Sequence, residues 1–145
     1  MKIEPAIEAK VEWLLKKTES SLSQHLGIEY LEYHRDRVVA RMPVDSRTKQ
    51  PFGLLHGGAS LALAESLASV GGVLNVDEET HRVVGIEINA NHLRATREGW
   101  VQGIATPLHR GKRTQVWEVR IAAESDGKLI CISRCTLAVV DVGSV

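Results

Sequence analysis

The chain has 145 residues, the length of one domain, and its 43% hydrophobic and 25% charged residues permit a packed core and exclude a disordered chain. Its 18 basic and 18 acidic residues give a formal net charge of zero, which argues against a partner recognised by bulk charge, such as nucleic acid or an anionic membrane. No apolar tract approaches a membrane span and the first residues lack the apolar segment of a signal peptide, so we expect a cytoplasmic protein.

The first third of the chain predicts a helix and a β-hairpin. Apolar residues recur at helical spacing after Pro5, which suits a first helical turn, so residues 5–20 are expected to form an amphipathic helix. Residues 27–33 and 37–42 are short and partly β-branched or aromatic, which predicts the two strands of a hairpin. A polar loop over 43–53 follows.

A run of small and apolar residues predicts a central helix from Gly57 to Leu74. Apolar side chains surround this helix almost completely, which is typical of a buried helix. Glu65 is its only carboxylate, and a buried glutamate is unfavourable unless it is paired, protonated or used. Glu65 is therefore a candidate general base or nucleophile, the alternative being a buried acid bonded to a backbone group or an arginine.

Four strand-like segments follow. The first alternates between two faces, and its expected core-facing residues are Val84, Ile86, Ile88 and Ala90. The others are 100–108, 115–123 and 129–140, and Asp126-Gly127 before the last is a strong hairpin signal. A long helix followed by such a meander predicts an α+β fold in which an antiparallel sheet wraps around the helix.

The start of the central helix predicts an oxyanion site. Gly57 and Gly58 leave bare backbone N–H groups where the helix dipole favours negative charge, which suits acyl transfer. Gly57 and Glu65 are eight residues apart, or about 12 Å along a helix, so both cannot meet one carbonyl carbon within a single copy. If both act on one carbonyl, two antiparallel copies must share each active site.

Three polar residues could assist this chemistry. Ser69 lies one turn after Glu65 on the same face and could hold a water molecule, while its alternative is a small packing residue. His56 could orient a substrate carbonyl or fix the loop, and Gln50 offers an amide donor before the helix.

Two basic groups could bind phosphates. His92 and Arg94 lie at the end of one strand, and a turn carries His109, Arg110, Gly111, Lys112 and Arg113. The alternative for the turn is a solvated loop. Metal binding is not expected, because the histidines lie on separate elements and Cys131 and Cys135 are about 13 Å apart along a strand.

The chain closely resembles the hotdog-fold acyl-CoA thioesterases in residues 42–58 (MPVDSRTKQPFGLLHGG) and 64–66 (AES). Residues 84–92 (VGIEINANH) and 115–117 (QVW) extend the similarity to the branch with the phenylacetate-pathway, type-II 4-hydroxybenzoyl-CoA and 1,4-dihydroxy-2-naphthoyl-CoA enzymes. The resemblance implies a single hotdog domain over 1–145, with an antiparallel sheet around one long helix and an N-terminal helical extension over 1–24.

The resemblance also implies a reaction and its residues. It implies hydrolysis of an acyl-CoA thioester without metal or separate cofactor, by a homodimer with shared sites that usually pairs into a homotetramer. Glu65 matches the catalytic carboxylate, and Gly57 matches the N–H that polarises the thioester carbonyl. Gln50 and His56 match residues that orient the carbonyl and the departing thiol, and Ser69 matches the hydroxyl that positions water. His92 and Arg94 match positions near the CoA phosphates, and the turn at 109–113 fits the same phosphate role.

We therefore expect a thioesterase acting on an aromatic acyl-CoA, such as 1,4-dihydroxy-2-naphthoyl-CoA. The alternatives are a proofreading thioesterase on carrier-protein thioesters, a hotdog hydratase or dehydratase, and a non-catalytic acyl-CoA-binding module. Release of free thiol separates the hydrolases from the other two. The sequence leaves open whether Glu65 activates water or attacks the thioester itself.

Overall fold

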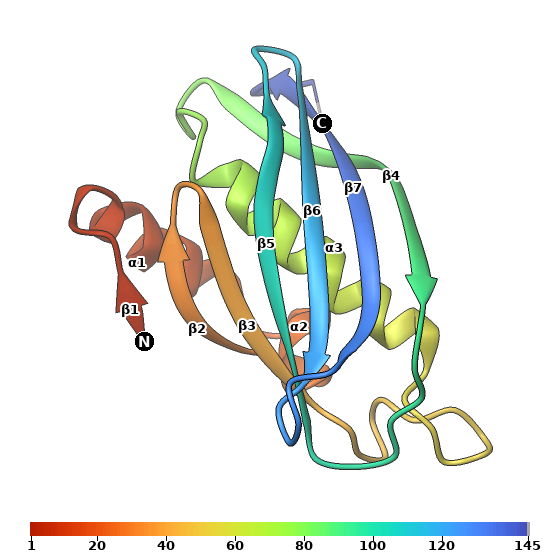
Figure 1. Cartoon of the computed structure of the whole chain (residues 1–145). Helices are drawn as coiled ribbons and strands as arrows, with labels where there is room; N and C mark the ends of the chain where they lie inside the picture. Colours follow the sequence, from red (N-terminus) through yellow and green to blue (C-terminus); the bar gives the residue numbers. More distant parts are fainter. Residues whose placement is uncertain (145) are drawn as a thin grey trace.

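In the computed structural model, which describes residues 1–144, a curved seven-stranded sheet packs against one main helix, α3 (Figure 1). The elements in chain order are β1 (Lys2–Ile3), the 3₁₀ turn η1 (Pro5–Ile7), α1 (Glu8–Lys17), α2 (Leu22–His25), β2 (Glu29–His34), β3 (Arg37–Pro43), α3 (Gly57–Val73), β4 (His81–His92), β5 (Trp100–Arg110), β6 (Thr114–Ala123) and β7 (Leu129–Asp141). Within the described residues, no helix combines the length and the apolar character needed to cross a membrane.

The sheet has the strand order β1-β2-β3-β5-β6-β7-β4. All neighbouring strands are antiparallel except β1, which pairs with β2 in parallel through two residues. Because β4 is the last strand in this order, one side of its backbone has no neighbouring strand within residues 1–144.

Most predicted elements are found close to their expected bounds. The helix expected over 5–20 is η1 and α1, the predicted hairpin is β2 and β3, and the three later strands are β5, β6 and β7. The sequence did not reveal β1 or the four-residue helix α2, which Ser21 caps by accepting a hydrogen bond from the Gln24 N–H at 3.4 Å. Elements of two and four residues are too short to show a periodic pattern.

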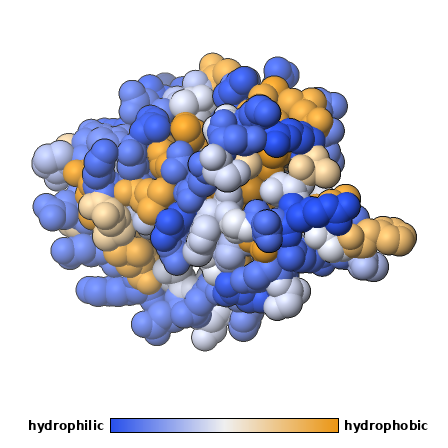
Figure 2. All heavy atoms as spheres, turned by 60° about the horizontal axis from the view of Figure 1, so that its bottom comes forward, coloured by the Kyte–Doolittle hydropathy of each residue, from blue (hydrophilic) through white to orange (hydrophobic). Residues whose placement is uncertain are grey.

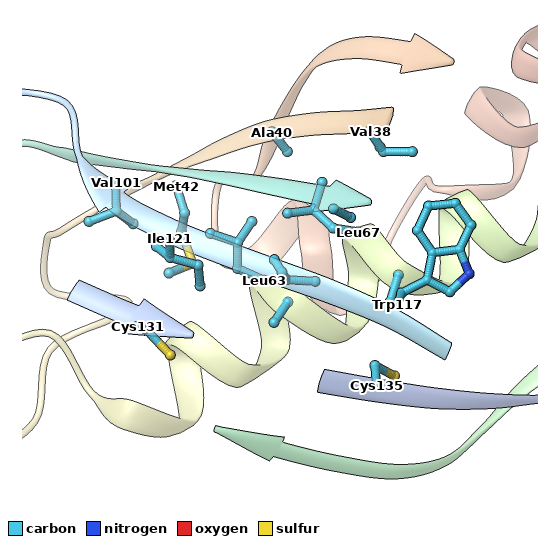
Figure 3. Packing of buried hydrophobic residues seen from close by; sticks show 14 of the residues in the cluster. Val38, Ala40, Met42, Leu63, Leu67, Val101, Trp117, Ile121, Cys131 and Cys135 are labelled. Atoms are coloured by element: carbon cyan, nitrogen blue, oxygen red, sulfur yellow. The ribbon is translucent and has the colours of Figure 1, made fainter. Parts of the chain in front are cut away.

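The core lies between α3 and the concave face of the sheet (Figure 3). Leu63 and Leu67 of α3 are fully buried there, as is Trp117 of β6. Glycines allow this close packing: a Cβ added to Gly71 would lie 2.6 Å from the Trp117 ring, and one added to Gly103 would lie 2.5 Å from Leu67 Cδ1.

The expectation that α3 is buried on all sides is wrong for the single chain. Its buried residues form one face and are Ala59, Ser60, Leu63, Ala64, Leu67, Ala68, Gly71 and Gly72. The other face carries Leu61, Ala62 and Val70, which are half-buried, and Glu65, which is exposed. The sheet covers one side of the helix only, so an apolar face of α3 remains uncovered.

The predicted faces of β4 are wrong in their first half, because a β-bulge interrupts the alternation at Ile86. Gly85 pairs with Leu137 and Glu87 with Thr136, which leaves Ile86 without a partner in the register. Val83 therefore faces α3 in place of Val84, and Ile86 is 58% exposed. Ile88 and Ala90 pack on the core as expected.

Candidate active site

Thr48 fixes the loop that leads into α3. Its buried hydroxyl donates to the Pro43 carbonyl at 2.7 Å and accepts from the Asp45 N–H at 3.1 Å. Its carbonyl oxygen accepts a hydrogen bond from the His56 N–H at 2.8 Å. These bonds set the position from which the chain enters the helix at His56.

His56 caps the N-terminus of α3. Its Nδ1 accepts a hydrogen bond from the Gly58 N–H at 2.8 Å. In the neutral ring this bond places the proton on Nε2, which makes Nε2 a donor for a ligand. The N–H groups of Ala59 and Ser60 bond to the His56 carbonyl, whereas no acceptor within residues 1–144 bonds to the Gly57 N–H. The Gly57 N–H is thus available to an anion or a carbonyl oxygen.

Gly57 lines a surface pocket of about 360 Å³ together with Gln50, His92 and Arg94. A Cβ added to Gly57 would lie 2.9 Å from His92 Nε2, so the imidazole lies directly against the helix start. The Gln50 side-chain oxygen accepts from the Phe52 N–H, which leaves its amide NH₂ free to donate into the pocket. Four of the predicted site residues therefore meet around the helix N-terminus.

The surface around this end of the molecule is mixed. Figure 2 turns forward the end that lies at the bottom of Figure 1, where the loop before α3 runs, and shows separate hydrophobic areas among hydrophilic residues. Two exposed apolar side chains near the pocket are Phe52, in the loop before α3, and Leu93, directly after β4.

An ion pair holds Arg94 at the pocket. Its Nη2 lies 2.9 Å from Asp126 Oδ2 in the turn between β6 and β7. The guanidinium of Arg94 lowers the pKa of the Asp126 carboxyl through this bond. Asp126 thereby orients a cation on the pocket wall.

Glu65 lies outside this pocket, on the uncovered face of α3. Within residues 1–144 its carboxylate forms no ion pair and no hydrogen bond, so the alternative of a buried, bonded acid does not describe this chain. A Cβ added to Gly85 of β4 would lie 2.6 Å from Glu65 Oε1. Ser69 follows one turn later and is half-buried.

Cys135 on β7 is buried near this carboxylate. Burial, together with the smaller effect of the negative charges of Glu65 and Glu87, raises the pKa of its thiol to about 11. The thiol therefore stays protonated at neutral pH, and a thiolate does not compete with Glu65.

The basic turn between β5 and β6 lies at the other end of the sheet from the pocket (Figure 1). Arg110 donates to Asn75 Oδ1 at 3.1 Å, just beyond the C-terminus of α3. Because α3 has 17 residues, its two ends are about 24 Å apart. One chain therefore does not bring the turn residues His109, Arg110, Gly111, Lys112 and Arg113 to the pocket.

Sequence reasoning missed two residues that shape the site. Thr48 reads as an ordinary loop residue, and nothing in its neighbourhood marks it. Gly85 carries a signal, because a glycine inside an alternating strand often marks a bulge or a close approach of another group.

The profile of the thioesterase superfamily matches residues 52–130. The 1,4-dihydroxy-2-naphthoyl-CoA hydrolase of Escherichia coli is 53% identical over 122 residues, which cover 84% of this chain and 88% of that protein. The proofreading thioesterase EntH of Cronobacter turicensis is 51% identical over 120 residues, covering 83% of this chain and 86% of the relative. A mutant thioesterase from Pseudomonas aeruginosa is similar in structure, with a TM-score of 0.86 and 47% identity over 90% of this chain and 94% of that one.

These similarities confirm the resemblance found in the sequence, and they agree with the arrangement of the sheet, α3 and the pocket at its N-terminus. The chain belongs to the thioesterase superfamily and is a hotdog-fold enzyme that hydrolyses thioesters.

Proposed function

We propose that this enzyme hydrolyses aromatic acyl-CoA thioesters in active sites that two copies of the chain share. The observation that carries the proposal is a pair of unpartnered groups on α3: the Gly57 N–H and, two turns later, the exposed Glu65 carboxylate, neither of which has a partner within residues 1–144. A donor and a base are the two groups that thioester hydrolysis requires.

Two features support a second copy. Gly57 and Glu65 are about 12 Å apart along the helix, too far to act on one carbonyl. The uncovered apolar face of α3 and the open edge of β4 are the surfaces that an antiparallel copy would cover. Such a copy places the N-terminus of one α3 near the middle of the other. Pairing of two dimers into a homotetramer remains a prediction from the family resemblance.

In the shared site, the Gly57 N–H and His56 Nε2 of one copy donate to the thioester carbonyl oxygen as negative charge develops on it. Glu65 of the other copy takes a proton from a water molecule held beside Ser69, and this water attacks the carbonyl carbon. Direct attack by Glu65, giving a mixed anhydride that water then hydrolyses, uses the same placement. In both routes the C–S bond breaks and CoA leaves as a thiolate.

The relatives support the proposed acyl group and leave two carriers to compare. One relative acts on 1,4-dihydroxy-2-naphthoyl-CoA, an aromatic acyl thioester, and this relative supports the aromatic acyl group that we propose; another relative is a proofreading thioesterase. We propose that His92 and Arg94 contact the CoA phosphates, and that the basic turn at 109–113 of a neighbouring copy adds to this contact.

The test is thiol release from 1,4-dihydroxy-2-naphthoyl, benzoyl, 4-hydroxybenzoyl, phenylacetyl and medium-chain CoA thioesters, and from an aryl carrier-protein thioester. We expect one aromatic CoA thioester to be fastest, and Glu65→Gln to lower its kcat by a factor of about 100 or more with substrate affinity kept. Glu12→Gln, which changes an exposed carboxylate on α1, is the matched control and should retain kcat.

Turnover by Glu65→Gln near that of the unmodified enzyme would remove Glu65 as the catalyst. Release from the carrier-protein thioester alone would replace CoA by a protein-bound pantetheine as the carrier. No release from any of these thioesters would contradict the proposed substrate class.

A further inference from the structure

We propose that Gly85 is a positioning residue for Glu65: the missing side chain of Gly85 gives the carboxylate its place against the backbone of β4. This inference rests on the proposed role of Glu65. It adds to the reaction a residue that supplies no functional group of its own.

The contact at Gly85 is specific to Glu65. A Cβ added to Gly85 would lie 2.6 Å from Glu65 Oε1 and 3.7 Å from Glu65 Cδ. Apart from the chain neighbours of Gly85, no other heavy atom of residues 1–144 lies within 4 Å of that Cβ. The backbone of Gly85 is not in the left-handed region, so alanine can adopt its conformation. A methyl group at this position therefore meets the carboxylate and leaves the core untouched.

The bulge at Ile86 explains why Gly85 faces Glu65. Opposite Leu137, whose side chain is fully buried, Gly85 lies on the face of β4 that is turned to α3. After the bulge the alternation restarts, so that Ile88 faces the same side. Without the extra residue, Gly85 and Ile88 would lie on opposite faces of the strand.

At two places along the contact between α3 and β4, a glycine of one element faces a polar side chain of the other. At the helix start, Gly57 of α3 lacks the Cβ that would lie 2.9 Å from His92 Nε2 of β4. Further along, Gly85 of β4 lacks the Cβ that would meet Glu65 of α3. In each case a glycine on one element gives room to a polar side chain of the other. By contrast, Gly71 and Gly103 give room to buried core side chains.

A side chain at position 85 is expected to lower kcat by displacing the Glu65 carboxylate. Glu65 has no hydrogen-bond partner within residues 1–144, and its carboxylate reaches the space that a Cβ of Gly85 would take. A methyl group at position 85 must displace the carboxylate by several tenths of an ångström or more, and a misplacement of about 1 Å can lower a rate on the order of 100-fold. The proposed binding residues Gln50, His92 and Arg94 lie at the pocket by the helix start, away from Gly85, so KM is expected to stay unchanged.

The experiment is Gly85→Ala, with Gly85→Val as a larger step. We expect kcat to fall about 10-fold to 100-fold for alanine and further for valine, with KM, melting temperature and the molar mass in solution unchanged for alanine. Gly103→Ala is the matched control, because its added methyl would lie 2.5 Å from Leu67 Cδ1 in the core: it should lower the melting temperature and leave kcat of the folded enzyme intact. Asn91→Ala, on the same strand as Gly85, should change neither kcat nor the melting temperature.

The same substitution in a Glu65→Gln background separates positioning from general distortion. If Gly85 acts through the Glu65 carboxylate, Gly85→Ala lowers kcat little further once that carboxylate is gone. An equal loss in both backgrounds, or a loss of folding or of assembly in Gly85→Ala, would overturn the inference.

The outcomes also separate this inference from the proposed function. If Glu65→Gln keeps its turnover, the proposed catalyst fails and the positioning role fails with it. If Glu65→Gln loses turnover while Gly85→Ala keeps the kcat of the unmodified enzyme, the catalyst stands and only the role of Gly85 is wrong.

Discussion

At the scale of single residues, His56 has a structural role as a helix cap and, in the proposed mechanism, a chemical role as a donor. Its Nδ1 accepts from the Gly58 N–H and completes the N-terminus of α3, while its Nε2 is left to donate. A residue that only capped the helix could be replaced by other capping residues without loss of activity, whereas a donor to the substrate could not.

This difference gives a prediction. His56→Asn should keep the cap and the stability but lose most of kcat, because the asparagine side chain is too short to reproduce the Nε2 donor. His56→Ala should lose the same activity and also about 1 kcal/mol of stability with the cap. Urea unfolding and thiol release measured on both variants check the two effects separately. Full activity in His56→Asn would reduce His56 to a helix cap.

The sequence predicted the place of a residue correctly where that place depends on its neighbours along the chain. The position of Gly57 at the helix start follows from its neighbours, and the structure gathers Gln50, His92 and Arg94 around it. The exposure of Glu65 did not follow, because the residues on its face of α3 are apolar and only the three-dimensional arrangement shows that the sheet leaves this face uncovered.

At the scale of elements, α3 depends on glycines that its own helix propensity disfavours. Gly71 and Gly72 weaken the helix, yet both are buried where an added Cβ would lie 2.6 Å from Trp117 and 2.7 Å from Leu137 Cδ1 of the sheet. The packing of Trp117 against the helix is the reason for the glycine at position 71.

We therefore expect Gly71→Ala to destabilise the fold although alanine is the better helix former. The gain in propensity is about 1 kcal/mol, whereas a methyl group whose carbon lies 2.6 Å from a fully buried ring forces an overpacking loss of about 1–3 kcal/mol. Equilibrium unfolding in urea measures the net change, expected at about 1 kcal/mol of lost stability. Trp117→Leu should make Gly71→Ala neutral or stabilising, and additive effects of the two changes would contradict this explanation.

Strand β4 shows where prediction of elements ends. Its existence follows from its alternation, although the structure extends it to His81–His92, and its faces depend on a bulge that is defined by the register with β7. The alternation of one strand contains no information on the partner's register, so the sequence placed Val84 and Ile86 on the wrong face. The interrupting Gly85 was the one local hint.

At the scale of the whole molecule, the uncovered face of α3, the open edge of β4 and the separation of Gly57 from Glu65 lead to one proposal. A single chain leaves the helix face and the strand edge uncovered and keeps the donor and the base apart. An antiparallel second copy would cover both surfaces and bring its Glu65 to the first copy's Gly57. A shared site of this kind has a consequence that a site within one chain lacks, namely that two inactive variants can restore each other.

The variants for this test are Glu65→Gln and Gly57→Pro. Proline at the first helical position removes the Gly57 N–H and fits the helix backbone, because His56 already has the extended conformation, with ψ of 131°, that precedes proline. Its Cβ would lie 2.9 Å from His92 Nε2 and so displaces that imidazole too, which leaves the Gly57 half of the site defective in the same chain. In a mixed dimer, one site combines both defects, while the other combines the intact Glu65 of one chain with the intact Gly57 of the other. Random mixing makes half of the dimers mixed, so we expect about a quarter of the unmodified activity in the refolded mixture and about half in the isolated mixed dimer, from two inactive preparations. The measurement is thiol release after the two chains are unfolded, mixed and refolded together, with the mixed dimer isolated by two different affinity tags. Mixed dimers without activity would show that each chain carries its own complete site, and the two-copy proposal would then be wrong.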